Sequence, residues 1–366
     1  MQFIDLRAQY EKIEKDINKR IQRVFEHCRF IMGPEVQKLE EKLADYVGVK
    51  HCIGVASGTD ALQISLMALD IGRKDEVITT AFTFVATGEV ILLLGAVPVF
   101  VDIDPHTYNI NPNLIEELIT HRTKAIMPAS LYGQCADFDA INAIAEKHGV
   151  FVIEDGAQSF GAEYKKRKSC STTTVGCTSF FPSKPLGCYG DGGACFTNDD
   201  SLAKAIREIR VHGQDHRYHH TRLGINSRLA TLQAAILLSK FEIFPEEVEL
   251  RVKIGQRYTE LLNDPNIVAP YIEPYNTSVY AQYTIQIDNR DKVQNRLKRK
   301  NIPTAVHYPV PLNLQPAFKR KQNNINIPVA KAVADRVISL PMHPFLSKAD
   351  QDIIAYTVKR SIYEKS

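Results

Sequence analysis

Several features that would assign this protein to a class are missing from its sequence. The formal net charge is only +3 over 366 residues, which is too small to indicate binding to nucleic acid or to an acidic membrane surface. The longest apolar run, residues 90–101, contains a proline and is too short to span a bilayer. No secretory signal is visible, because residues 1–25 are charged and predict an amphipathic helix. We therefore expect no nucleic-acid partner and no membrane partner.

The seven cysteines are scattered and include no CxxC pair. An odd number of unpaired cysteines indicates reduced thiols, so a cytoplasmic location is expected. A GxGxxG motif after an early strand is also missing, which argues against a nicotinamide-dependent Rossmann enzyme.

What the chain does contain is a regular alternation of helical and strand patterns from about residue 50 to about residue 210. The strands are continuous apolar runs, which is typical of parallel strands buried on both faces. The pattern therefore predicts an α/β fold, with a mostly parallel central sheet and helices on both faces. The predicted helices are 57–71, 83–95, 111–120 and 137–149, and the predicted strands are 76–80, 97–104, 124–130 and 150–155.

The pattern changes after residue 174, where short strands and longer charged helices predict a smaller α+β unit toward the carboxyl end. The length allows two domains. We expect a large domain of residues 1–245, which includes the N-terminal helix, and a small domain of residues 246–366. The later predicted elements are strands 174–183, 193–198 and 280–287, helices 202–213 and 244–263, and a final helix.

Polar groups at the carboxyl ends of the parallel strands are site candidates, because open α/β sheets bind ligands there. Asp155 closes one predicted strand, where it could cap a turn or pair with a protonated ring nitrogen. Ser57, Gly58 and Thr59 precede a helix. Backbone N–H groups at such a position suit a phosphate, and ordinary N-capping is the alternative.

Lys184 lies between Pro182 and Pro185 in the stretch SFFPSKPLGCYGDGG. The prolines fix the loop, and the glycines let the backbone pass close to a ligand. A loop lysine alone is usually a solvated charge, whereas partial burial would lower its pKa and make the amine a nucleophile. Phe82 and Phe84 follow a strand, and either could stack on a flat ring or belong to the core.

In this order the motifs resemble the DegT/StrS family of nucleotide-sugar aminotransferases, which depend on pyridoxal phosphate (PLP). The resemblance covers nearly the whole chain and implies a fold-type I aminotransferase whose large domain binds PLP. It also implies a homodimer with shared active sites. It rests on the segments FIDLRAQY, GPEVQKLEEKLADYVG, SGTDAL, EDGAQSFGA, SFFPSKPLG, GDGGA, NSRLATLQAA and HYPVPL.

The resemblance further implies a role for each matching residue. Lys184 would be the Schiff-base lysine and would move the proton during catalysis. Asp155 would pair with the pyridinium nitrogen, and Gln158 would lie beside the ring. Asn226 would reach the phosphate from the neighbouring subunit. The other cofactor contacts would be Gly58, Thr59 and Ser179 at the phosphate and Phe84 on the ring.

Within the family, the chain is most similar to enzymes that aminate UDP-2-acetamido-2-deoxy-3-oxo-glucuronate with L-glutamate as the donor. Such an amino sugar would serve a surface polysaccharide such as the lipopolysaccharide O-antigen. Arg228 suits the bidentate grip of the sugar carboxylate, with a structural ion pair as the alternative. The other expected substrate contacts are Phe30, Ser183, His307 and Tyr308.

One departure from the family pattern concerns the turn after the first helix. The pattern has Gly and Tyr where this chain has Cys28 and Phe30, so Phe30 keeps a stacking face and loses a hydroxyl.

Three other functions remain open. A 4-keto nucleotide-sugar aminotransferase would use a sugar with no carboxylate for Arg228. A sugar dehydratase of the same family typically replaces the lysine, so Lys184 argues against it. A non-catalytic nucleotide-sugar-binding protein would hold no covalent PLP.

The segment HGQDHRYHH, residues 212–220, contains four histidines. No cysteine or well-spaced acid completes a metal site there, so we expect no metal. The resemblance instead implies a loop near the active site of the partner subunit.

Overall fold

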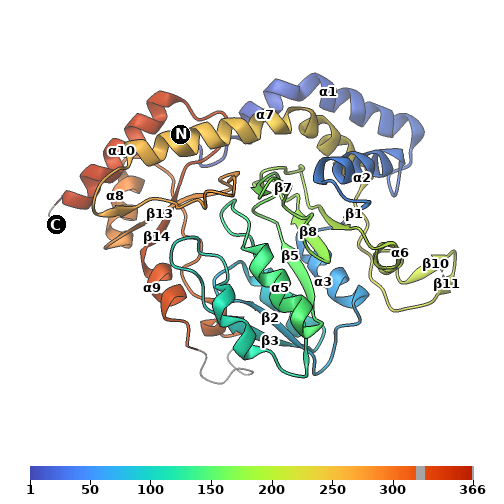
Figure 1. Ribbon diagram of the computed structural model, residues 1–366. Coiled ribbons are helices and arrows are strands. Elements are labelled where there is room, and N and C mark those ends of the chain that lie inside the picture. Colours follow the sequence, from blue (N-terminus) through green and yellow to red (C-terminus); the bar gives the residue numbers. More distant parts are fainter. Residues whose placement is uncertain (319–325, 365–366) are drawn as a thin grey trace.

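A computed structural model describes residues 1–318 and 326–364. Its centre is a seven-stranded sheet with the order β1-β9-β8-β5-β4-β2-β3 (Figure 1). The strands from β8 to β3 are parallel to one another, and β9 is antiparallel to both of its neighbours. The predicted mostly parallel sheet is confirmed. Its strands are β1 (His51–Val55), β2 (Glu76–Thr80), β3 (Val97–Val101), β4 (Thr123–Met127), β5 (Phe151–Asp155), β8 (Val175–Ser179) and β9 (Gly193–Thr197).

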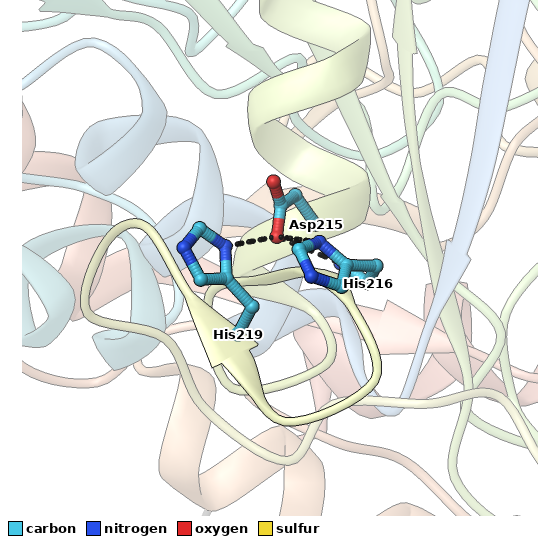
Figure 2. Close-up of side chains that lie close together, drawn as sticks. All are labelled: Asp215, His216 and His219. Carbon is cyan, nitrogen blue, oxygen red and sulfur yellow. Dashed lines mark hydrogen bonds and ion pairs between the residues drawn. The ribbon is translucent and has the colours of Figure 1, made fainter.

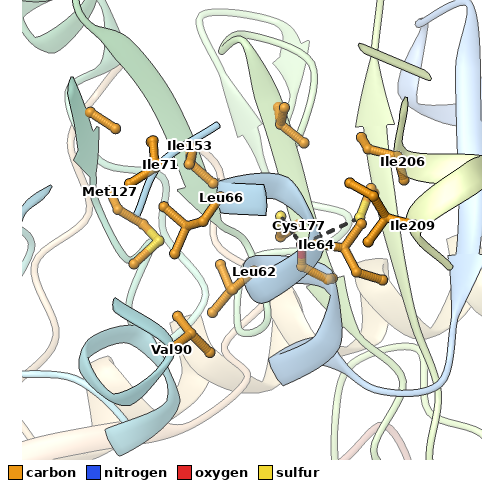
Figure 3. Packing of buried hydrophobic residues seen from close by; sticks show 14 of the residues in the cluster. Leu62, Ile64, Leu66, Ile71, Val90, Met127, Ile153, Cys177, Ile206 and Ile209 are labelled. Carbon is orange, nitrogen blue, oxygen red and sulfur yellow. Dashed lines mark hydrogen bonds between the residues drawn. The ribbon is translucent and has the colours of Figure 1, made fainter. Parts of the chain in front are cut away.

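Helices cover both faces of this sheet. Successive side chains of a strand point to opposite faces, and because both sets are apolar here, both faces are buried. Val77 and Ile153 belong to one buried cluster, whereas the adjacent Ile78 and Val152 belong to another. Figure 3 shows the first cluster, in which α3 packs against the sheet. One face carries α3 (Gly58–Ala68), α4 (Val85–Leu93) and α6 (Asp200–Ile209), and the other carries α2 (Pro34–Val47), α5 (Phe138–His148) and the first part of α7 (Thr231–Leu261).

A second, three-stranded antiparallel sheet has its own hydrophobic core, in which Tyr258 of α7 and Tyr283 are fully buried. The long helix α7 therefore runs from the core of the large sheet into that of the small one, with α1 packed along it (Figure 1). The predicted boundary at residues 245 and 246 lies inside α7 and stays a prediction. The elements here are α1 (Leu6–His27), β12 (Ile267–Val268), β13 (Tyr283–Ile287), α8 (Arg290–Arg299), α9 (Pro328–Arg336), β14 (Val337–Leu340) and α10 (Lys348–Tyr363).

The predicted helix at 111–120 is wrong, because the segment forms two short 3₁₀ turns, Pro112–Leu114 and Glu116–Leu118. Both ends of the segment are held by neighbouring strands. The Asn111 amide donates to the Asp102 carbonyl at 3.1 Å, and the Thr120 hydroxyl donates to Glu76 at 2.5 Å. The tighter turns fit the span between these two anchors.

Five short elements complete the described chain, and one of its main strands was not predicted. The prediction missed β1, whose five residues include a glycine that interrupts the apolar run. No helix among residues 1–318 and 326–364 combines the length and the apolar character needed to cross a bilayer. The short elements are β6 (Glu163–Tyr164), β7 (Arg167–Lys168), β10 (Gln214–His216), β11 (His219–His220) and a 3₁₀ turn at Leu312–Leu314.

All seven cysteines are free thiols, and only Cys28 is exposed. Burial raises the pKa of Cys52, Cys135, Cys170 and Cys177 well above the usual range. These thiols therefore stay protonated and pack as small apolar side chains.

Candidate active site

A cavity of about 440 Å³ opens at the carboxyl ends of the central strands. This is where a parallel sheet is expected to bind its ligand. All the residues that the family resemblance assigned to the site line this cavity, except Phe30, Asn226 and Arg228. Phe82, the other aromatic candidate, is fully buried in the core. The predicted residues that do line it are Gly58, Thr59, Phe84, Asp155, Gln158, Ser179, Ser183, Lys184, His307 and Tyr308.

Asp155 is the last residue of β5, and its side chain faces the cavity. The Thr87 hydroxyl donates to Asp155 Oδ2 at 2.7 Å, and the Ala157 amide donates to Oδ1 at 3.2 Å. Thr87 is completely buried in the first turn of α4, with its hydroxyl 3.2 Å from that of Thr83. The carboxylate is therefore held in one orientation by two neutral donors, and it keeps free lone pairs toward the cavity.

Lys184 projects into the same cavity from the loop between β8 and β9. Its backbone amide donates to the Phe181 carbonyl at 2.8 Å, and the Phe180 amide donates to Gly192 at 2.7 Å, which closes the loop on itself. Burial lowers the pKa of Lys184, and the charge of Asp155 partly opposes this shift. No hydrogen bond or ion pair from another described residue engages the Lys184 Nζ. Both conditions favour a neutral, nucleophilic amine.

The other end of the cavity is formed by the amino-terminal end of α3. The Ser57 hydroxyl caps the helix by accepting from the Asp60 amide at 3.0 Å. Gly58 lies so close to Ser179 that an added Cβ would come within 2.5 Å of the Ser179 Cβ. A glycine is therefore required at this contact. It brings the Ser179 hydroxyl beside the free N–H groups of the first helical turn, an arrangement that suits a phosphate.

Gln158 connects two sides of the cavity. Its Oε1 accepts from the Tyr132 amide at 2.9 Å, and its Nε2 donates to the Tyr308 hydroxyl at 3.0 Å. The adjacent His307 places Nδ1 2.8 Å from the hydroxyl of Ser339 on β14. Burial, together with the charge of Lys184, lowers the pKa of His307 to about 4. His307 is therefore neutral at physiological pH.

Three predicted residues lie outside the cavity, and they occur on neighbouring segments. The Thr231 amide donates to the Phe30 carbonyl at 3.0 Å, and Phe30 is 40% exposed. Asn226 is exposed, and the Arg228 Nε is buried without a hydrogen-bond partner among the described residues. A position outside this chain's own cavity agrees with the expectation that Asn226 serves a neighbouring subunit, which stays a prediction.

Cys28 adopts a left-handed conformation with φ of 54°. It forms the C-cap of α1, where glycine is favoured.

The expectation that no well-spaced acid accompanies the histidines of residues 212–220 is wrong. A β-bulge in the β10–β11 hairpin brings Asp215 between His216 and His219 (Figure 2). The sequence spacing alone did not show this, because the hairpin turn sets the three side chains together.

The prediction missed several residues that shape the cavity. Thr87 looks like a core residue of an apolar helix, and only the fold shows that it faces Asp155. Ser130, Asp191 and Gln282 line the cavity from three separate segments. Asp191 belongs to the GDGGA segment, where no role was predicted for it, and Ser130 and Gln282 belong to none of the motifs. Their polar character in or beside apolar runs was the only available signal.

The residues around this cavity fit pyridoxal phosphate. Asp155 offers a fixed carboxylate for a protonated ring nitrogen, and Lys184 offers an unbonded amine. The end of α3 and Ser179 offer donors for a phosphate. Phe84 is 51% exposed and leaves a ring face open for stacking.

Comparison with known proteins decides the family. Residues 11–359 match the DegT/DnrJ/EryC1/StrS aminotransferase family. The chain belongs to this family. It is 61% identical to the UDP-2-acetamido-2-deoxy-3-oxo-D-glucuronate aminotransferase of Pseudomonas aeruginosa, over 97% of this chain and 98% of that protein.

Two solved structures share the fold. One is DesV of S. venezuelae in complex with a ketimine intermediate, with a TM-score of 0.97, 35% identity and coverage of 100% and 99% of the two chains. The other is ntda from Bacillus subtilis with the bound cofactor PMP, with a TM-score of 0.91, 29% identity and coverage of 99% and 83%. The chain is thus a PLP-dependent aminotransferase of fold-type I, as the sequence predicted.

The contact between Thr87 and Asp155 gives a first test. Thr87→Val removes the hydroxyl at nearly constant volume, and we expect it to weaken PLP binding by roughly tenfold, because a hydrogen bond to a charged group is lost. Absorption titration of the apoenzyme measures the affinity. Thr87→Ser, which keeps the hydroxyl, is the matched control; equal affinities of the two variants would contradict a positioning role.

The lowered pKa of His307 gives a second test. The folded-state pKa lies below the unfolded value of 6.5, so the stability from this group is full above pH 6.5 and is lost as the pH falls through about 4. When the pH falls from 7 to 4.5, the free energy of unfolding of the apo wild type should decrease by about 2 kcal/mol more than that of the apo His307→Asn variant. Urea unfolding at both pH values measures this difference. Identical losses of unfolding free energy in the two proteins would show that the pKa of His307 is not lowered in the folded state.

Proposed function

We propose that this enzyme transfers an amine from L-glutamate to UDP-2-acetamido-2-deoxy-3-oxo-D-glucuronate. The observation that carries the proposal is the 61% identity, over nearly the whole of both chains, to the Pseudomonas aeruginosa aminotransferase of that substrate. The cavity adds support, because it presents Lys184 and Asp155 together in a volume of about 440 Å³.

We propose the cofactor contacts that the family resemblance implies, and the cavity supports them because these residues line it. Asp155 would hold the ring nitrogen in its protonated form, and Gln158 would lie beside the ring. The phosphate would be held by Gly58, Thr59 and Ser179, and Phe84 would stack on the ring. When bound, PLP supplies an electron sink for the pair of electrons left when a C–H bond breaks.

Lys184 does the proton transfer in this proposal. Its amine takes the proton from Cα of glutamate in the first half-reaction and passes that proton to the bound cofactor. The amino group would stay on the cofactor, and water would release 2-oxoglutarate. In the second half-reaction the same amine returns a proton to the sugar carbon that receives the nitrogen. A single buried amine suits both directions, since burial lowers its pKa and favours the neutral form that accepts a proton.

For the substrate contacts we propose the residues that the family resemblance implies, and the lining of the cavity supports three of them. Ser183, His307 and Tyr308 line the cavity and would contact the sugar nucleotide. A neutral His307 has one donor and one acceptor nitrogen, so it can form hydrogen bonds to the sugar without adding a positive charge to the cavity. Arg228 would bind the carboxylate of the uronate bidentately, and Phe30 would offer an apolar face.

The proposal includes a homodimer in which each active site is completed by the partner. Phe30, Asn226 and Arg228 lie outside the cavity of their own chain, and Phe30 and Ile31 expose apolar surface beside them. Covering this surface with a second copy would bring Asn226 to the partner's phosphate site. We place the enzyme in the cytoplasm, where its product would supply the synthesis of a surface polysaccharide.

The choice of acceptor is tested with the glutamate-treated holoenzyme after removal of free glutamate. We expect the visible absorption band of the cofactor to return with the 3-oxo uronate and not with a 4-keto UDP-sugar. Mass spectrometry of the nucleotide sugar should show the new amine. Lys184→Ala, as the control, should form no product. A response to the 4-keto sugar alone would overturn the proposed acceptor while keeping the reaction class.

The shared active site is tested by complementation. In this proposal one subunit supplies Lys184 and its partner supplies Asn226 and Arg228. Homodimers of Lys184→Ala, or of the double variant Asn226→Ala/Arg228→Ala, should therefore be inactive, because every site lacks one of these two contributions. After coexpression in equal amounts, about a quarter of all sites would be intact, so about a quarter of wild-type activity should return. Absence of any recovery in isolated mixed dimers would contradict a site built by two subunits.

A further inference from the structure

The hairpin of β10 and β11 gathers three potential metal ligands outside the active-site cavity. The Nδ1 atoms of His216 and His219 lie 2.9 and 2.8 Å from the same oxygen of Asp215, Oδ1 (Figure 2). One ligand atom from each residue lies within 4.8 Å of the other two. The two imidazole rings are stacked, with centroids 4.5 Å apart and planes 18° from parallel. All three side chains thus converge on one point.

The backbone fixes this convergence. Gln214 pairs with His220 and His216 pairs with His219, with a bulge between the two pairs. The two strands approach closely at the base of the hairpin. An added Cβ at Gly213 would lie 1.8 Å from the Arg222 carbonyl oxygen, so only glycine fits there. The ligands are therefore held on a closed hairpin, so binding an ion requires little reorganisation.

The chemistry of the three groups selects the ion. Asp215 offers a carboxylate oxygen, and His216 and His219 each offer an imidazole nitrogen. Two imidazole nitrogens and one carboxylate oxygen suit Zn²⁺, with water in the fourth position. Mg²⁺ and Ca²⁺ prefer oxygen ligands alone.

We propose that Asp215, His216 and His219 form a Zn²⁺ site on the surface of the protein. The ion replaces the contacts that now join both rings to Asp215 Oδ1. It links the two strands of the hairpin and fixes the loop that joins them. All three residues are exposed in the described chain.

The proposal is tested by calorimetric titration of ZnCl₂ into chelator-treated holoenzyme that carries no polyhistidine tag. We expect one ion per chain. Asp215→Asn and His219→Asn should each weaken Zn²⁺ binding by roughly tenfold or more, because each variant removes one of three protein ligands.

His220→Asn is the matched control, because His220 lies next to His219 on the same hairpin and its Nδ1 is 2.8 Å from the His212 carbonyl oxygen. It should bind Zn²⁺ as the wild type does. Anomalous diffraction at the zinc edge should place the ion between the three side chains. If all variants bind Zn²⁺ equally, or if no ion occupies this position, the site does not exist. Unchanged melting temperatures show that the variants are folded.

Discussion

The carboxyl end of β5 places two consecutive carboxylates in the interior, and the active site depends on how each one is satisfied. A strand sends neighbouring side chains to opposite faces, so Glu154 and Asp155 cannot share partners. Glu154 is fully buried, and burial raises its pKa. It accepts from the Cys170 amide at 2.6 Å and from the hydroxyls of Ser130 and Ser169 at 2.9 and 2.7 Å. A buried carboxylate without these donors would cost several kcal/mol.

These hydrogen bonds also determine where the cavity walls stand. Ser130 lines the cavity, and its hydroxyl donates to Glu154. The buried carboxylate of Glu154 therefore holds the loop that carries Ser130 in its position at the cavity wall. On the other face, Asp155 is held by Thr87 of α4. The small sheet contributes through Ser339, which contacts His307 and Thr284 at 2.8 Å each. The cavity therefore depends on both cores of the molecule, which the continuous helix α7 joins.

The sequence predicted most strands of the central sheet, and it proposed two principal site residues that the structure brings to one cavity. Apolar runs such as residues 150–155 identify buried parallel strands, and their ends identify the binding edge, so Asp155 could be located. Lys184 is ambiguous alone and became a candidate through the order of the surrounding motifs. Thr87 could not be predicted, since its hydroxyl has a partner only after α4 has packed against β5. The 3₁₀ turns after Asn111 and the cluster around Asp215 likewise depend on contacts that spacing does not encode.

The central claim is that Lys184 is the residue to which the cofactor is attached. Sodium borohydride reduction of the holoenzyme, followed by peptide mass analysis, tests it most directly. The account predicts a pyridoxyl group on the peptide that contains Lys184, and none after prior treatment with glutamate. Lys240 is also buried, and burial lowers its pKa to about 8. A pyridoxyl group on Lys240, or on no lysine at all, would contradict the account.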